Sequence, residues 1–358
     1  MLHYTSAITY TQDMPSLHET TSLTKNIIKW GGIVLGVILL LILLYRGGKI
    51  IASALFPKKP VAPTAAFGKL PTIIFPENVS TSKFTYSLDT VTGDLGDFPD
   101  RANVYKMIPP VPTLLDLKTT RTQLNLAGFN SNETIITDTQ YSWRDARQTD
   151  RKITINIVSK DFIITTSYLN YPNLSPSGEV DPQDAAKVAT DFLQQLLLYP
   201  SDFDPTKTAT QLLTLQGTTL FASSSLSTAE MVRVDLFQKD INKFPIMYAH
   251  PPYSSMHFLI GGQNPGQILD ASFSHQAVGK ESTSYSIIPV NDAYTQLKEG
   301  KAYIASYYGN SSNITIKDVY LAYFMSEKKQ DYLMPIYVFE GKEGFFAYIS
   351  AVRNDWIR

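Results

Sequence analysis

The chain has 358 residues, of which 18% are charged and 12% are aromatic, and its formal net charge is −1. This balance implies no basic surface for nucleic acid, and the absence of cysteine excludes disulfides, thiolate catalysis and cysteine-ligated metal sites. Tyrosine and phenylalanine are plentiful, with 21 and 18 residues, and this abundance favours β-sheets.

Residues 1–26 are polar and lack an apolar period, so we expect a disordered N-terminal tail. The next stretch, residues 27–45, is uncharged between Lys29 and Arg46. A run of this length predicts a transmembrane helix when flanking cations reach the lipid headgroups. The expected membrane-anchoring residues are Lys29, Trp30, Leu35, Leu39, Leu43, Tyr45 and Arg46. Ser53 and Ala54 lie in a cleavable-looking run, so a cleaved signal peptide stays an alternative.

Residues 46–65 predict an interfacial segment and then a proline-rich linker, since Pro57, Pro60 and Pro63 interrupt any helix. Two opposing arguments bear on the side of the membrane that the C-terminal part occupies. More lysine and arginine follows the span than precedes it, which favours a cytoplasmic C-terminal part. Large domains are translocated largely regardless of such charges, and the low-charge composition is typical of extracytoplasmic domains. We therefore expect a single-pass protein of the cytoplasmic membrane with an extracytoplasmic C-terminal domain.

Residues 66–175 predict a first α+β unit. Alternating residues predict strands at 84–88, 104–108, 135–143, 152–158 and 162–168, of which 135–143 and 152–158 form a hairpin. A helix is expected over residues 114–127, with Thr113 as its N-cap and Gly128 as its stop.

Residues 176–358 predict a second α+β unit. Asp181 and Pro182 are a typical helix start, and apolar residues recur at helical spacing as far as residue 198. A short helix is expected over residues 289–300. The expected strands are 231–237, 256–260, 267–275, 315–325, 333–340 and 345–352. The predicted fold class is thus α+β, with an N-terminal transmembrane helix followed by two units of an antiparallel sheet with helices on one face.

Several clusters suggest chemistry, but each has a simpler interpretation. Four carboxylates at Asp89, Asp94, Asp97 and Asp100 could supply oxygen ligands to calcium, yet their spacing does not fit an EF-hand. A solvated turn is favoured, and cation binding is left open. Three histidines fall in one region, at His250, His257 and His275, without the helical spacing of a metal site.

Two further clusters are better explained by ordinary loop and turn composition than by a functional site. Ser223, Ser224 and Ser225 lack the G-x-S-x-G turn that presents a nucleophile. The expected hairpin tip carries Arg144, Arg147, Arg151 and Lys152, which could meet an acidic partner or lipid headgroups, although exposed turns are usually charged. We predict no catalytic residue, no metal site and no cofactor.

Pro335 interrupts the strand pattern of residues 333–340. Because proline cannot donate a hydrogen bond to a neighbouring strand, this strand either starts there or runs along a sheet edge. An exposed edge could accept a strand from another protein. The candidate partner edge is therefore Pro335, Tyr337 and Phe339.

The last 65 residues or so also carry a recognisable pattern. Its parts are Pro289, Val290, Ala293, Leu297 and Gly300, then Val319 with Leu321, Ala322 and Tyr323, then Tyr332, Pro335, Tyr337, Phe339 and Gly341, and finally Ala347, Tyr348 and Ala351. This pattern resembles the signature of PepSY-like and YycH/YycI-type extracytoplasmic domains. Residues 63–71 resemble uncharacterised single-pass membrane proteins of candidate-phylum bacteria. The resemblance implies tandem small α+β modules outside the cytoplasmic membrane, with regulatory or inhibitory binding roles and no catalytic residues.

Together these features predict a membrane-anchored binding module with a regulatory or scaffolding role in the cell envelope, and no catalysis. The expected partners are the lipid bilayer and another envelope protein or peptide, without nucleic acid. A structural, adhesin-like component is one alternative. An envelope hydrolase is another, which would require acidic or histidine side chains converging in one pocket.

Overall fold

The structure is a computed structural model that describes residues 35–36, 40–41, 64–79, 83–91, 93–170, 181–261 and 266–358. The chain divides into two units, Met1–Ala62 and Pro63–Arg358. The predicted tail and most of the predicted span, residues 27–45, lie outside the described residues. In the described ranges, no helix is both long and apolar enough to cross a membrane.

The fold class expected from the sequence is wrong. The described part of the second unit is mostly β-sheet, in two sheets of eight and nine strands, with the helices α2, α3 and α4. The nine-stranded sheet takes strands from both sides of residue 175, and the eight-stranded sheet joins strands near residue 85 to strands near residue 340. The sheets therefore do not follow two consecutive units along the chain, because strand pairing here is largely non-local.

The nine-stranded sheet is antiparallel, in the order β3-β4-β5-β6-β12-β11-β9-β7-β8. Its strands are β3 (Thr134–Ile135), β4 (Gln140–Arg144), β5 (Lys152–Asn156), β6 (Phe162–Thr165), β7 (Ala209–Gln216), β8 (Thr219–Ala222), β9 (Met231–Asp235), β11 (Met256–Gly261) and β12 (Gln267–Phe273). The predicted hairpin is present as β4 and β5, in which Ser142 lies opposite Thr154.

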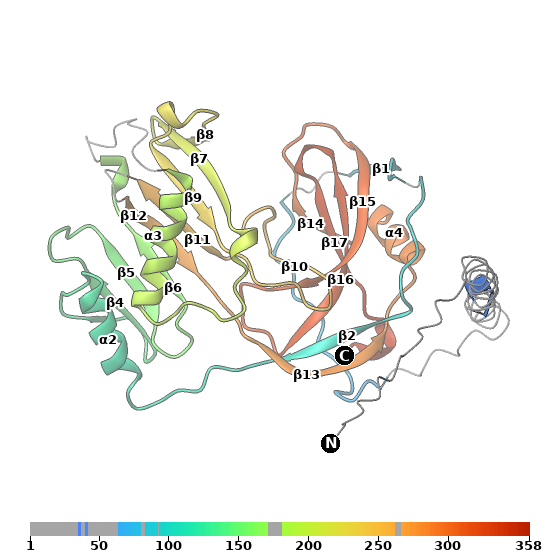
Figure 1. The fold of residues 1–358 in the computed structure, drawn as a ribbon, viewed down its shortest axis with the longest axis horizontal. Coiled ribbons are helices and arrows are strands. Elements are labelled where there is room, and N and C mark those ends of the chain that lie inside the picture. The colour runs from blue at the N-terminus through green and yellow to red at the C-terminus, as the bar shows by residue number, and fades with distance from the viewer. Residues whose placement is uncertain are drawn as a thin grey trace, which may run out of the picture. The chain divides into compact units, whose positions relative to one another are not determined.

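Helix α3 (Pro182–Gln195) covers one face of this sheet (Figure 1). It begins where the sequence predicts, since the Asp181 carboxylate accepts the Gln183 N–H at 2.7 Å and Pro182 occupies the first turn. Helix α2 (Asp116–Leu126) begins two residues later than predicted. Thr113 is not its N-cap, but the Asp116 carboxylate accepts the Thr113 N–H at 2.7 Å.

Side chains alternate along the strands of the nine-stranded sheet, and this separates its two faces. On β5, Ile153 and Ile155 are buried in the core that also contains the α3 residues, whereas Thr154 is only partly buried. On β11, Phe258 is buried in that core, and His257 is partly buried on the other face. A period of two of this kind places apolar residues against α3 and Thr154 and His257 on the face away from it. Leu259, on the same face as His257, belongs to a small buried cluster with Leu213, Met231 and Leu269.

The eight-stranded sheet has the central order β1-β15-β16-β17-β14, with β2, β10 and β13 paired to it off this path. Its strands are β1 (Thr85–Leu88), β2 (Arg101–Met107), β10 (Ile246–Met247), β13 (Val278–Ser286), β14 (Tyr303–Ser306), β15 (Asn313–Phe324), β16 (Tyr332–Gly341) and β17 (Phe346–Ser350). β1 and β10 are parallel to β15, and its other pairs are antiparallel.

Both faces of the eight-stranded sheet are covered. Helix α4 (Val290–Lys298) packs Ala293 and Leu297 into a core that also contains Phe339. On the opposite face Phe75 stacks on Tyr303 with ring centroids 5.2 Å apart. β16 and the last part of β15 consequently consist of almost continuous buried residues, in contrast to the alternating β5 of the nine-stranded sheet.

Candidate functional site

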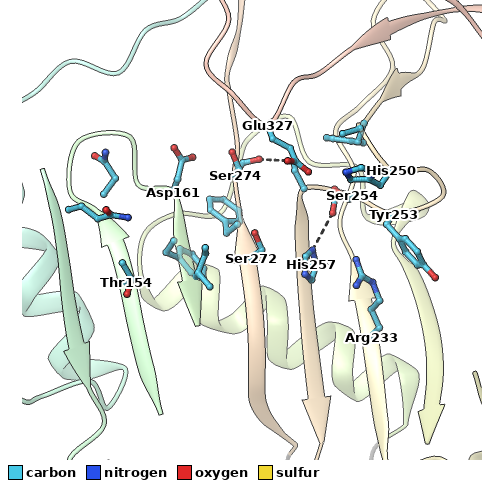
Figure 2. A pocket seen from close by; sticks show the side chains of 18 residues that line it. Thr154, Asp161, Arg233, His250, Tyr253, Ser254, His257, Ser272, Ser274 and Glu327 are labelled. Carbon is cyan, nitrogen blue, oxygen red and sulfur yellow. Dashed lines mark hydrogen bonds between the residues drawn. The ribbon is translucent and has the colours of Figure 1, made fainter. Parts of the chain in front are cut away.

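A cavity of about 580 Å³ lies over the polar face of the nine-stranded sheet (Figure 2). Strands β4, β5, β6, β9, β11 and β12 supply its floor, residues 248–255 form one wall, and Glu327 enters from the turn between β15 and β16. Its lining residues are Gln140, Thr154, Asn156, Asp161, Phe162, Ile163, Arg233, Tyr248, Ala249, His250, Tyr253, Ser254, Ser255, His257, Ser272, Phe273, Ser274 and Glu327. The cavity is thus built by the nine-stranded sheet, by residues 248–255 and by the turn between two strands of the eight-stranded sheet.

The floor contains a row of four side chains on adjacent strands. Thr154 lies opposite Ile163, Ile163 opposite Ser272, and Ser272 opposite His257. Residues paired in this way point to the same face of a sheet. Ile163 is 52% exposed, so the row offers one apolar contact between hydroxyl and imidazole groups.

Two buried tyrosines of the eight-stranded sheet hold the wall at residues 248–249. The Tyr303 hydroxyl donates to the Ala249 carbonyl at 2.8 Å, and the Tyr348 hydroxyl donates to the Tyr248 carbonyl at 3.1 Å. Burial, and secondarily the nearby Glu327 carboxylate, raises the pKa of Tyr303 to about 12, and burial also raises the pKa of Tyr348 well above its ordinary value. Both phenols therefore remain protonated donors at physiological pH.

The cationic side chain of Arg233 is already engaged. Its Nε and Nη2 donate to the two Asp235 carboxylate oxygens at 2.7 and 3.0 Å, and its guanidinium lies 4.3 Å from the Tyr253 ring centroid. Asp235 also accepts the Ser254 N–H at 2.9 Å. This bidentate, stacked arrangement fixes the arginine and neutralises its charge within the cavity wall.

His257 is a neutral hydrogen-bonding group. Burial, followed by the positive charge of Arg233, lowers its pKa, so the ring is uncharged at neutral pH. Nδ1 lies 3.3 Å from the Ser254 carbonyl oxygen, which can only accept a hydrogen bond. The proton is therefore on Nδ1, and Nε2 is left as an acceptor.

Two carboxylates complete the cavity lining. Asp161 accepts from the Ser159 hydroxyl at 2.6 Å. Glu327 lies in a turn that the Gln276 amide fixes, since Nε2 of Gln276 donates to the carbonyls of Ser326 at 2.8 Å and Lys328 at 3.0 Å. The Glu327 charge acts to raise the pKa of His257, against the larger effect of burial.

Two serine hydroxyls of the cavity wall are occupied by backbone partners. Ser254 Oγ donates to the Leu236 carbonyl at 2.5 Å, and Ser255 Oγ donates to the Ser274 carbonyl at 2.9 Å. Neither hydroxyl is placed as a nucleophile with the imidazole as its base. The described geometry presents fixed hydrogen-bonding groups to a ligand.

The structure brings two of the three predicted histidines together. His250 and His257 both line the cavity. His275 lies elsewhere, with Nε2 at 2.8 Å from an oxygen of the Asp202 carboxylate. In the part of the chain that the structure describes, no group of three or more side chains could hold a metal ion.

The predicted carboxylate run forms a turn. Gly93 and Gly96 adopt positive φ angles, and the Gly96 N–H donates to Asp94 at 2.9 Å. Two other members form ion pairs, Asp89 with Lys317 and Asp100 with Arg101. These partners agree with a solvated Gly/Asp turn.

The basic hairpin tip is partly buried. Arg151 is 8% exposed, lies 4.4 Å above the Phe129 ring and pairs with Asp145 at 3.1 Å. Its guanidinium is therefore part of the fold and does not extend into solvent. The serine run closes its own turn, because Ser225 accepts the Ser227 N–H at the start of a short 3₁₀ helix.

The candidate partner edge lies in the interior of the eight-stranded sheet. β16 has hydrogen-bonded neighbours on both sides, and Pro335, Tyr337 and Phe339 are buried. Proline is tolerated there because the Ala351 carbonyl accepts the Ile288 N–H at 2.8 Å, while the Ala351 N–H donates to the Pro335 carbonyl at 3.0 Å. These three residues therefore present no free edge to a partner strand.

Sequence reasoning missed Asp161, Glu327 and Gln140 as members of a site. Each occurs in an ordinary loop or strand position, and they come from segments about 20 to 190 residues apart along the sequence. The usable signal was the alternation of polar and apolar residues at 152–156 and 270–274. That pattern indicates a sheet with one polar face but does not identify what covers it.

No family model matches the sequence, and neither does any curated protein. Among solved structures, the chain is similar to an uncharacterized protein from Eubacterium rectale ATCC 33656, with 13% identity and a TM-score of 0.41. That match covers 77% of this chain and 92% of the other. Similarity at this level carries no inference about function.

Proposed function

We propose that this protein is a binding module that holds an extended segment of a partner protein or peptide in the cavity over the nine-stranded sheet, in a regulatory or scaffolding role and without catalysis. The observation that carries this proposal is the open row of Thr154, Ile163, Ser272 and His257. Adjacent strands are about 4.8 Å apart, so the row is roughly 14 Å long. An extended peptide covers that length with about four residues.

The chemistry of the cavity suits a peptide. Backbone amides of a ligand would meet hydroxyl, amide and imidazole groups, and Ile163 would contact one apolar side chain. Phosphate or nucleic acid is disfavoured, because Arg233 is already paired with Asp235. A purely structural role needs no cavity, so the cavity favours binding over the adhesin-like alternative.

The location outside the cytoplasm, at the cytoplasmic membrane, stays a prediction from the sequence, and so does the resemblance to PepSY-like and YycH/YycI-type domains. Both are consistent with a regulatory binding role in the cell envelope.

The test is a selection of displayed random 12-residue peptides on the full chain. We expect peptides that bind the unmodified protein and are lost with Ser272→Trp, which fills the centre of the row. Thr154→Trp is a second blocking variant, and Thr219→Trp on the exposed strand β8 is the matched control. Thermal unfolding checks that each variant is folded. Equal recovery on blocked and control variants would refute the proposal.

A hydrolase is the second candidate, because Asp161, Glu327 and the neutral His257 line one cavity. Such groups could act as general acid and base. Hydrolysis of peptide, ester or glycoside substrates by the unmodified chain, abolished in Glu327→Gln, would replace the binding proposal.

A further inference from the structure

The charges that line the cavity are unequal, and this bears on the ligand. Arg233 lines the cavity and carries a positive charge, which Asp235 neutralises through two hydrogen bonds. His257 adds no charge at neutral pH. Asp161 and Glu327 lie along one end of the cavity, above the row of the floor (Figure 2), and no ion pair with either is found among the described residues. This end of the cavity therefore has a surplus of negative charge.

The hydrogen-bonding groups named above also favour a positively charged ligand, because they are acceptors. Nε2 of His257 is an acceptor, and the carboxylates of Asp161 and Glu327 can only accept when ionised. A ligand with hydrogen-bond donors and a positive charge suits these acceptors, whereas a carboxylate or phosphate meets repulsion. A lysine ammonium carries three donors and an arginine guanidinium carries five.

The acidic end is held in place before a ligand arrives. Gln276 fixes the turn that carries Glu327, since its amide bonds three backbone groups, the carbonyls of Ser326 and Lys328 and the N–H of Gln330. The Ser159 hydroxyl orients the Asp161 carboxylate. Prepositioned acceptors lose little conformational freedom on binding, so they contribute to selectivity.

We infer that the cavity selects a peptide with a basic side chain, lysine or arginine, which sits at the end lined by Asp161 and Glu327. This inference rests on the proposed function and specifies its ligand. The apolar Ile163 lies on the same floor, so the recognised segment carries a basic residue close to an apolar one.

The experiment uses the peptides recovered on the full chain. We expect lysine or arginine to be enriched at one position, and an acetylated, amidated peptide with that residue replaced by norleucine to bind about tenfold more weakly. Blocking both peptide ends ensures that the effect comes from the side chain. Asp161→Asn combined with Glu327→Gln should abolish the difference between the two peptides while the norleucine peptide still binds.

The matched control combines Asp138→Asn with Glu281→Gln, which removes the same charge from exposed positions outside the cavity. It should retain the tenfold preference. Peptides that depend on the cavity but show no basic preference would overturn this inference and leave the proposed function intact. Recovery of no cavity-dependent peptide would overturn both.

Discussion

The two sheets of the second unit bury their faces differently. The eight-stranded sheet is covered on both faces, by α4 on one side and by residues around Phe75 on the other. The nine-stranded sheet has α3 on one face, and its other face forms the cavity floor beside a small buried cluster of Leu213, Met231, Leu259 and Leu269. The difference indicates a division of roles, in which the doubly covered sheet supports the wall and the singly covered sheet presents the ligand-facing groups.

The largest expected effect tests this division through stability. Phe339→Ala in the eight-stranded sheet should lower the free energy of unfolding by about 3–5 kcal/mol, because Phe339 is fully buried and its loss leaves a cavity. Thr154→Ala on the open face should change it by about 0.5 kcal/mol or less. Urea unfolding followed by circular dichroism measures both. Similar losses in the two variants would mean that the open face is also structural.

A second prediction concerns the connection between the sheets. Tyr303→Phe and Tyr348→Phe each remove a hydroxyl that bonds a carbonyl of the cavity wall, and each should cost about 1–2 kcal/mol. Hydrogen exchange at residues 248–255 should become faster. Tyr332→Phe is the control, since no hydrogen bond to its hydroxyl is found in the described ranges. Unchanged exchange in both variants would contradict this role.

A third prediction uses pH. The native pKa of His257 is lowered, so between that value and about 6.5 the unfolded chain binds a proton that the native chain does not. This contribution to stability is complete above pH 6.5 and is lost as the pH falls toward the native pKa. The groups that act on the imidazole are Arg233, Asp235, Glu327 and the Ser254 carbonyl.

His257→Gln should therefore flatten the decline in melting temperature between pH 7 and pH 5. If the melting temperatures of the variant and the unmodified chain fall by the same amount over this range, the imidazole is not desolvated.

The smallest expected change in melting temperature comes from substitution of Asp270. This residue lies on the same face of the sheet as Arg233. Burial raises its pKa, and Arg233 only partly opposes this. A raised native pKa means that stability falls as the pH rises above about 3.8. Asp270→Asn should therefore raise the melting temperature slightly at pH 7. A lower melting temperature would mean that Arg233 needs this charge.

Local patterns predicted much of the secondary structure. The cap at Asp181, the β4–β5 hairpin and the long C-terminal strands lie close to their expected positions, because each depends on neighbouring residues. The prediction missed β7, β8, β10, β13 and β14. β13 reads VGKESTSYS, a polar stretch without apolar alternation, and it pairs with β2 about 180 residues earlier in the chain.

The position of Pro335 shows why strand arrangement could not be predicted. Proline suggested an edge, but the Ile288 N–H supplies the hydrogen bond that the Ala351 carbonyl would otherwise lack. No feature near residue 335 reveals a donor from residue 288. The cavity was missed for the same reason, since Asp161, His257 and Glu327 are far apart in the sequence and line one cavity only in the folded chain.

The pairing of β1 with β15 has a consequence for biosynthesis. Thr85 lies beside Asn313, so β1 leaves the ribosome more than two hundred residues before its neighbour does. The nine-stranded sheet is complete once residue 273 has been made, whereas the eight-stranded sheet must wait for nearly the whole chain. Translation that stops just short of β15 would leave β1 without its partner and β2 paired with β13 alone, and unpaired strand edges of this kind are prone to aggregate.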